Sequence, residues 1–297
     1  MSKIVPPSRE KPYGLARVCR VWEIPRATLY YQRAADVSPT TPARRGPTGP
    51  MSDEDLVKKI RAVLDASPFH GEGHRKVWAR LRFAGIRTSK RRTLRLMREN
   101  NLLAPARVGR PRGPRAHDGT IITSKPDVMW GTDLTTTLTV LEGNAHVFIA
   151  VDHCTAECVG IHAAKRGTRF EALEPIRQGV TEIFGRFEAD AAKGLSIRHD
   201  HGSAYVSDHF QTEIVFFGMT ASPSFVQAPE GNGCAERFIR TLKENLLWVR
   251  HFDTIEQLRA ALMEFKKVYN TTWLIERHGY LTPSQAREAF KPSRRAA

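Results

Sequence analysis

Three acidic residues in the second half of the chain have local sequences that suit metal chemistry beside a phosphodiester. Asp133 lies in WGTDLT, Asp200 in HDHGSAY and Glu236 in NGCAERFIRTLKE, with 35 residues between the last two. Carboxylate oxygens bind hard cations such as Mg²⁺, and a metal beside a phosphate stabilises the oxygens that attack and leave. A spacing of common residues would prove little, but the sequence around each acid makes the signal specific. The acids therefore predict metal-dependent phosphoryl transfer.

Two basic residues accompany the last acid on a predicted long helix over residues 233–249. Glu236, Arg240 and Lys243 share one face at i, i+4 and i+7. An apolar stripe occupies the opposite side and is expected to pack on a sheet: Phe238, Leu242 and Leu246. The helix thus presents one carboxylate and two cations to the same site, as binding of a metal and a phosphate requires.

The elements expected around these residues follow an α/β pattern. Strands are predicted at residues 128–141, 145–151, 158–163, 195–198 and 220–222, and helices at 168–187, 207–217, 233–249 and 254–270. Asp133 falls within the first strand and Asp200 directly follows the fourth. A three-stranded meander followed by helix–strand–helix–strand–helix is the order of a ribonuclease H-like core. We therefore predict an α/β ribonuclease H-like catalytic core, with a mixed five-stranded sheet and helices, preceded by small all-α segments.

The positive charge is concentrated before this core. Residues 1–125 carry 27 Lys and Arg against 10 Asp and Glu, whereas residues 126–297 carry 19 against 21, within a total net charge of +15. Lys and Arg displace counterions from phosphates, so this excess is typical of a nucleic-acid-binding arm. A merely solvated basic surface remains the alternative.

Helical patterns in the basic part suit helix-turn-helix elements. Residues 13–33 predict two short helices, the second beginning near Pro25 and directing Arg26 outward, although an ordinary helical hairpin fits equally well. Three apolar residues are expected to line one face of the first of these helices: Leu15, Val18 and Val21.

Three further helices are predicted between residues 52 and 99. The first has Ser52 as its N-cap, and the others span residues 74–83 and 89–99. Met97 and Leu94 are expected in the core of this segment. The last helix carries the arginines that we expect to contact DNA: Arg91, Arg92, Arg95 and Arg98.

The domain organisation predicted from these patterns has six parts. They are a helix-turn-helix-like segment (1–35), a linker (36–50), a helical DNA-binding domain (51–103), a basic linker (104–127), the catalytic core (128–252) and a C-terminal helix and tail (253–297). The sequence has no secretory signal, no apolar run of about 18 residues and four scattered cysteines, which predicts a cytoplasmic protein. His153, Cys154, Cys158 and His162 were weighed as a zinc cluster, but their spacing matches no known finger.

The runs around the three acids, together with the ending RHGYLTPSQA, resemble the catalytic blocks of a known family. They are similar to insertion-sequence transposases of the IS-three family, in particular its second-frame product, whose DDE core is like that of retroviral integrases. Upstream, GHRKVWARLRFAGIRTSKRRTLRLMRENNLL resembles the helical DNA-binding segment that precedes this core.

The resemblance implies strand cleavage and strand transfer at one site, without a covalent protein intermediate. Asp133 and Asp200 would share two Mg²⁺ (or Mn²⁺) ions, with Glu236 completing the second ion's site. Lys243 is expected to contact the terminal DNA, and Arg240 more weakly. The implied partners are the element's terminal inverted repeats, target DNA, further copies of the chain on that DNA, and an upstream helix-turn-helix protein.

Two other functions compete with transposition. A cellular ribonuclease H shares the fold but would not need a strongly basic arm. A catalytically inactive protein that binds the element ends and represses transposition is the second alternative, against which the intact acidic triad argues.

Overall fold

A computed structural model of the protein describes residues 3–5, 7, 10–37, 51–105, 121–224 and 229–291. The chain divides into two compact units, Met1–Pro50 and Met51–Ala297. Most of the linkers predicted at residues 36–50 and 104–127 lies outside the described residues. The boundaries predicted for the six segments therefore stay predictions.

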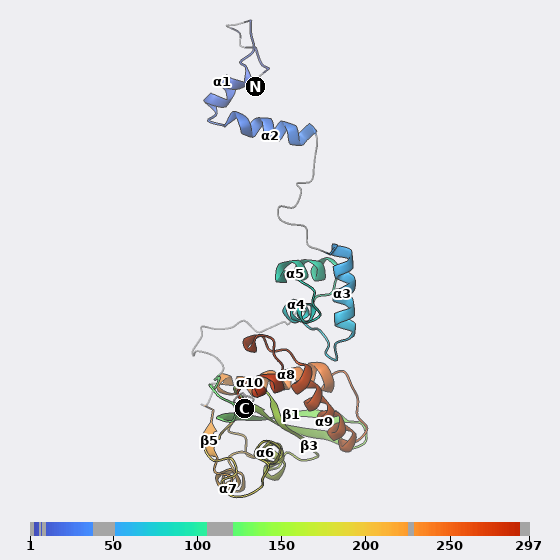
Figure 1. Ribbon diagram of the computed structural model, residues 1–297, viewed down its shortest axis with the longest axis vertical. Helices are drawn as coiled ribbons and strands as arrows, with labels where there is room; N and C mark the ends of the chain where they lie inside the picture. Colours follow the sequence, from blue (N-terminus) through green and yellow to red (C-terminus); the bar gives the residue numbers. More distant parts are fainter. Residues whose placement is uncertain are drawn as a thin grey trace, which may run out of the picture. The chain divides into compact units, whose positions relative to one another are not determined.

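The first unit contains the two helices predicted there, α1 (Leu15–Val21) and α2 (Arg26–Val37) (Figure 1). Cys19 is its buried hydrophobic residue in the described part. Of the three residues predicted to line one face of α1, Leu15 and Val18 are half-buried, whereas Val21, the last residue of the helix, is 71% exposed. Arg26 is exposed, as predicted.

The second unit begins with three helices, α3 (Asp53–Asp65), α4 (His74–Phe83) and α5 (Lys90–Glu99). The Ser52 hydroxyl accepts a hydrogen bond of 3.0 Å from the Asp55 N–H, which confirms the predicted cap. The helices enclose a small apolar core: Leu56, Ile60, Val77, Leu81, Leu96 and Met97. Met97 is buried as predicted, whereas Leu94 is only half-buried.

A five-stranded mixed sheet follows, as the sequence predicts. Its strands are β1 (Met129–Thr139), β2 (Gly143–Asp152), β3 (Cys158–Ala164), β4 (Ser196–His199) and β5 (Thr220–Pro223), in the order β3-β2-β1-β4-β5. The first three strands are antiparallel, and β4 and β5 are parallel to β1. This topology is that of a ribonuclease H-like core.

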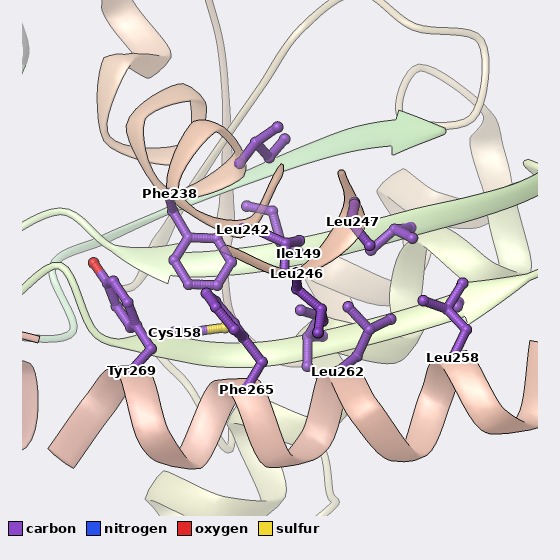
Figure 2. Close-up of a cluster of buried hydrophobic side chains, with 14 of the residues drawn as sticks. Ile149, Cys158, Phe238, Leu242, Leu246, Leu247, Leu258, Leu262, Phe265 and Tyr269 are labelled. Carbon is purple, nitrogen blue, oxygen red and sulfur yellow. The ribbon is translucent and has the colours of Figure 1, made fainter. Parts of the chain in front are cut away.

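Helices cover both faces of the sheet: α6 (Arg169–Phe184) and α7 (Asp208–Phe216) on one, α8 (Gly233–Leu242) and α9 (Ile255–Thr272) on the other (Figure 1). Alternation along β2 builds both cores, since successive side chains point to opposite faces. Phe148 packs with α6 and α7. Ile149 packs with α8 and α9, where Phe238, Leu242 and Phe265 close the layer (Figure 2).

The long helix predicted over residues 233–249 is not continuous. It begins as α8 and then widens into a π-helical turn, η2 (Lys243–Leu247), which places the adjacent Leu246 and Leu247 in the same core. The apolar face predicted for this helix is otherwise confirmed.

The C-terminal part adds two elements that the sequence analysis did not predict, η3 (Glu276–His278) and α10 (Pro283–Ala289). The α10 helix opens with a capping box between Thr282 and Gln285. Its Arg287 pairs with Asp127 and with Glu157, which joins α10 to the sheet. Across the described ranges, no helix combines the length and the apolar character needed to cross a bilayer.

Candidate active site

Asp133 lies in the middle of β1, opposite Ile149 of β2. Its side chain is half-buried, and Oδ1 accepts a hydrogen bond of 2.7 Å from the Leu134 N–H. The ladder with β2 runs through this position, and the ladder with β4 on the other edge of β1 ends two residues earlier, at Gly131. The strand therefore fixes the position of this carboxylate.

Asp200 directly follows His199, the last residue of β4, and is exposed. Its Oδ1 accepts a 2.8 Å hydrogen bond from the Gly202 N–H, so the turn after the strand holds the carboxylate as predicted. The parallel pairing of β4 with β1 brings this strand end to the side of the sheet where Asp133 lies.

Glu236 lies in the first turn of α8, where the helix dipole favours a negative charge, and its side chain is exposed. Lys243 is half-buried at the start of η2. Arg240 forms an exposed ion pair with Glu244 at 2.9 Å. Of the two cations predicted on this face, Lys243 lowers the pKa of Asp133, whereas Arg240 is engaged with Glu244.

Electrostatics connect these residues. The pKa of Asp133 is raised from 3.8 to about 6, chiefly by burial; the charges of Asp200 and Glu236 add to the rise, and the Leu134 N–H and Lys243 oppose it. Each of these groups is therefore close enough to Asp133 to change the pKa of its carboxyl group. The four residues come from β1, the end of β4, α8 and η2.

The acids approach one region without forming a closed chelate. Among the described residues, no three His, Cys, Asp or Glu side chains lie close enough together to hold one metal ion. The charges of Asp200 and Glu236 contribute to the raised pKa of Asp133, after its burial, because negative neighbours disfavour a further carboxylate. A divalent cation would relieve this repulsion, and an all-oxygen donor set suits Mg²⁺ or Mn²⁺, so the residues fit such an ion.

The histidines on either side of Asp200 bind backbone carbonyls. His199 Nδ1 donates to the carbonyl of Asp200 at 2.6 Å, and His201 Nε2 donates to the carbonyl of Ser224 at 2.8 Å. Burial lowers the pKa of His199, whose ring stacks on Tyr205. Both histidines hold the turn in place.

The residues considered for zinc are engaged separately. His153 Nδ1 bonds the Ile121 carbonyl, His162 pairs with Glu171, and Cys158 Sγ contacts the Gly160 carbonyl. The described residues thus assemble no zinc site from them.

The predicted DNA-contacting arginines of α5 divide into two groups. Arg91 and Arg98 are exposed. Arg92 and Arg95 pair with Asp53 of α3 at 2.8 and 2.6 Å, and the Arg95 hydrogen bond is the main reason that the pKa of Asp53 falls to about 2. These two arginines join α3 to α5.

Two residues beside the acids were missed by the sequence analysis. Arg198 is buried on β4, two positions before Asp200, and Asn232 is buried directly before α8. A charged residue inside a short buried strand is unusual, and this was the available signal for Arg198. Asn232 gave no signal, because its partner is 100 residues away.

Two parts of the chain match known domain families. Residues 52–110 match the family described as HTH-like domain, and residues 218–283 match the Integrase core domain. The second match includes Glu236 and Lys243.

Curated relatives extend these matches. The chain is 26% identical over 243 residues to transposase InsD of insertion element IS2A/D/F/H/I/K from Escherichia coli, an alignment that covers 79% of this chain and 78% of the relative. InsD of IS2-9 from E. coli K12 is equally identical, with 76% of its length covered.

Solved structures with a similar arrangement include a simian T-cell lymphotropic virus intasome (TM-score 0.44, 17% identity, 83% of this chain and 77% of that one). The HTLV-2 integrase catalytic core with magnesium gives a TM-score of 0.41 at 18% identity, covering 55% of this chain and 98% of that one. The sequence matches make the chain a homologue of the InsD transposases that carries an HTH-like and an integrase core segment.

Proposed function

We propose that this chain is a DNA transposase that cuts and joins strands by metal-dependent phosphoryl transfer, with Asp133, Asp200 and Glu236 as its catalytic acids. One observation carries the proposal: Asp133 on β1, Asp200 at the end of the adjoining strand β4 and Glu236 in the first turn of α8 come from elements that pack together, and the charges of Asp200 and Glu236 add to the raised pKa of Asp133. Homology to insertion-element transposases and the integrase core match support this class of reaction.

An integrase-type core implies dependence on a divalent metal. The three carboxylates would hold it, and Mg²⁺ (or Mn²⁺), with two ions in the site, is the form that we propose. When bound, the metal activates the attacking water or 3′-hydroxyl and stabilises the leaving 3′-oxygen.

The remaining charged residues would hold the DNA. Lys243 lies beside the acids and suits a phosphate of the DNA end, whereas Arg240 is paired with Glu244 and contributes less. Exposed arginines on two helical segments would follow the backbone elsewhere: Arg26, Arg91 and Arg98.

The partners follow from the reaction. Joining two element ends to target DNA requires both ends together, and we infer at least two copies of the chain on the DNA. An upstream helix-turn-helix protein is a further proposed partner. An inactive end-binding protein is not favoured, since its site would not need three mutually repelling carboxylates.

The test combines the full chain with DNA that carries its own element's ends, in Mg²⁺. Asp200→Asn removes the charge but keeps the oxygen that accepts from the Gly202 N–H, so the turn is retained. We expect this variant to bind the ends and to lose at least about 10³-fold in cleavage rate, since metal stabilisation supplies several kcal/mol.

The matched control is Asp65→Asn, at an exposed carboxylate at the end of α3. It should cleave like the wild type. Wild-type protein that binds the ends but does not cut them with Mg²⁺ or Mn²⁺ would contradict the proposed activity. Cleavage that survives Asp200→Asn would refute the assignment of the acids.

A further inference from the structure

A short junction, Gly231–Asn232, directly precedes α8 and contacts both strands that carry the aspartates. Resting on the function proposed above, we propose that Arg198 and Asn232 are positioning residues that tie the Glu236 helix to β4 and β1. The acids would then keep a fixed separation because three elements are fastened at one point.

The first tie runs from β4. Arg198 is 6% exposed, and its Nε donates to the Gly231 carbonyl at 3.2 Å. Its Nη1 donates to the Ser222 hydroxyl at 2.9 Å and reaches the carbonyls of Ser222 and Pro223 at 3.4 and 3.3 Å. One planar guanidinium therefore holds β5 and the junction at once, which a lysine ammonium with its single nitrogen cannot reproduce.

The acceptors that the Arg198 guanidinium contacts among the described residues include no carboxylate. In the described part of the chain, Arg198 forms hydrogen bonds with carbonyls and a hydroxyl rather than an ion pair. Burying a guanidinium without a counter-ion costs free energy, and burial lowers its pKa accordingly. An apolar side chain could fill this space at a lower cost in free energy. The buried cation, two residues from Asp200, therefore points to a role in the site.

The second tie runs from β1. Asn232 is 5% exposed, and its Nδ2 donates to the Thr132 carbonyl at 3.0 Å, directly before Asp133. Gly131 leaves room for this contact, because a Cβ there would lie 2.5 Å from Asn232 Oδ1 and 2.7 Å from His153 Nε2. The absence of a side chain at Gly131 on β1 therefore allows Asn232 to approach the strand.

The geometry transmits any displacement of the junction to the acids. Asn232 is the N-cap residue of α8 and Glu236 lies in the first turn of that helix, so a shift of the junction moves the start of the helix that carries the carboxylate. Magnesium requires oxygen ligands at about 2.0–2.1 Å in nearly ideal geometry.

The test uses the full chain with Arg198→Met and Asn232→Leu, which keep size but remove the donors. Mn²⁺ binding is measured by calorimetry without DNA, alongside thermal unfolding and strand cleavage. We expect Mn²⁺ affinity to fall about 10- to 100-fold, as for other residues that hold metal ligands in place. The kcat should fall while the KM for DNA is retained, and excess Mn²⁺ should restore part of the rate.

Two matched control residues donate the same kinds of side-chain hydrogen bond to backbone carbonyls, but on β3. Asn270 is buried and donates to the Cys158 carbonyl at 2.9 Å, and Arg259 donates to the Ala163 carbonyl at 2.7 Å. Asn270→Leu and Arg259→Met should lower the melting temperature and leave Mn²⁺ affinity unchanged. If all four variants changed Mn²⁺ binding only in proportion to lost stability, the positioning role would be overturned.

Failure of this inference is distinguishable from failure of the proposed function. Asp200-dependent Mn²⁺ binding that survives in Arg198→Met and Asn232→Leu would overturn the ties and leave the acids in place. Wild-type Mn²⁺ binding that does not depend on Asp200 would overturn both. If Arg198→Met does not fold, Arg198→Lys keeps the charge without the planar fork and should still lose Mn²⁺ affinity.

Discussion

At the scale of single residues, the half-buried Asp133 side chain decides how the site responds to pH. Its pKa is about 6 in the folded chain, against 3.8 ordinarily, through burial and through the charges of Asp200 and Glu236. Between these values the folded chain keeps a proton that the unfolded chain has lost. The free energy of unfolding must therefore fall as the pH rises through this window.

Asp133→Asn should remove this pH dependence. The amide oxygen can still accept the Leu134 N–H, while the charge is absent in both states. In metal-free buffer the variant should be more stable than the wild type at pH 7, by at most about 3 kcal/mol for a shift of roughly two pKa units, and the gain should vanish near pH 4. Denaturant unfolding from pH 4 to 8 measures this, and an equal gain at both ends would refute the raised pKa.

How far single residues were predictable depended on where their partners lie. The acids were found because each sits in a distinctive local string, and the structure gives Asp133 its electrostatic contact with the other two. Arg198 and Asn232 contact residues 33 and 100 positions away, and such contacts exist only after the sheet has formed. Local sequence patterns therefore do not predict these contacts.

At the scale of elements, α5 uses its arginines for two purposes. Arg92 and Arg95 face Asp53 and hold α3, whereas Arg91 and Arg98 are exposed. The sequence alone predicts DNA contact for all four arginines. The ion pairs separate a packing side from a side that is open to a phosphate backbone.

Substitutions on the two sides of α5 should therefore affect different properties, DNA binding on the exposed side and stability on the side that faces α3. Arg91→Ala and Arg98→Ala should weaken DNA binding and reduce the slope of log affinity against log salt by about one each, with unchanged melting temperature. Arg95→Ala should lower stability by about 0.2–1 kcal/mol, as for partly exposed ion pairs. Fluorescence anisotropy across salt concentrations and thermal unfolding separate the two. A salt slope that changed only with Arg95→Ala would reverse the assignment.

Element positions were largely predictable because caps and apolar periodicity are local. The helix predicted at residues 74–83 is α4 with the same bounds, and the predicted Ser52 cap forms. The π-helical turn at Lys243–Leu247 was not predictable, because its leucines belong to a core shared with α9, which forms only when distant parts of the chain pack together. The α10 helix was overlooked although Thr282 and Gln285 carry a capping-box pattern.

At the scale of the whole second unit, the helical segment is packed against the C-terminal part of the core. Phe69 enters the core cluster and meets the ring of Trp273 edge-on at 4.7 Å between centroids. The buried Glu72 pairs with Arg80, which also donates to the Thr272 carbonyl at 3.2 Å. These contacts predict that the segment and the catalytic core unfold together, which the sequence division at residues 103 and 128 did not suggest.

Phe69→Ala should make the three-helix segment and the catalytic core unfold in separate transitions. Truncating a buried phenylalanine costs about 3–5 kcal/mol, and here it removes packing between the parts rather than within either core. Calorimetry on the full chain should show one shared transition for these parts in the wild type and two in the variant. The three-helix segment should melt first, because its own core holds six buried residues. Phe83→Ala, at a side chain that is 65% exposed on α4, is the control and should keep the shared transition. If Phe69→Ala also melted in one step, the helices and the core would be joined by the remaining contacts, and the Arg80 and Trp273 interactions would then be the ones to remove.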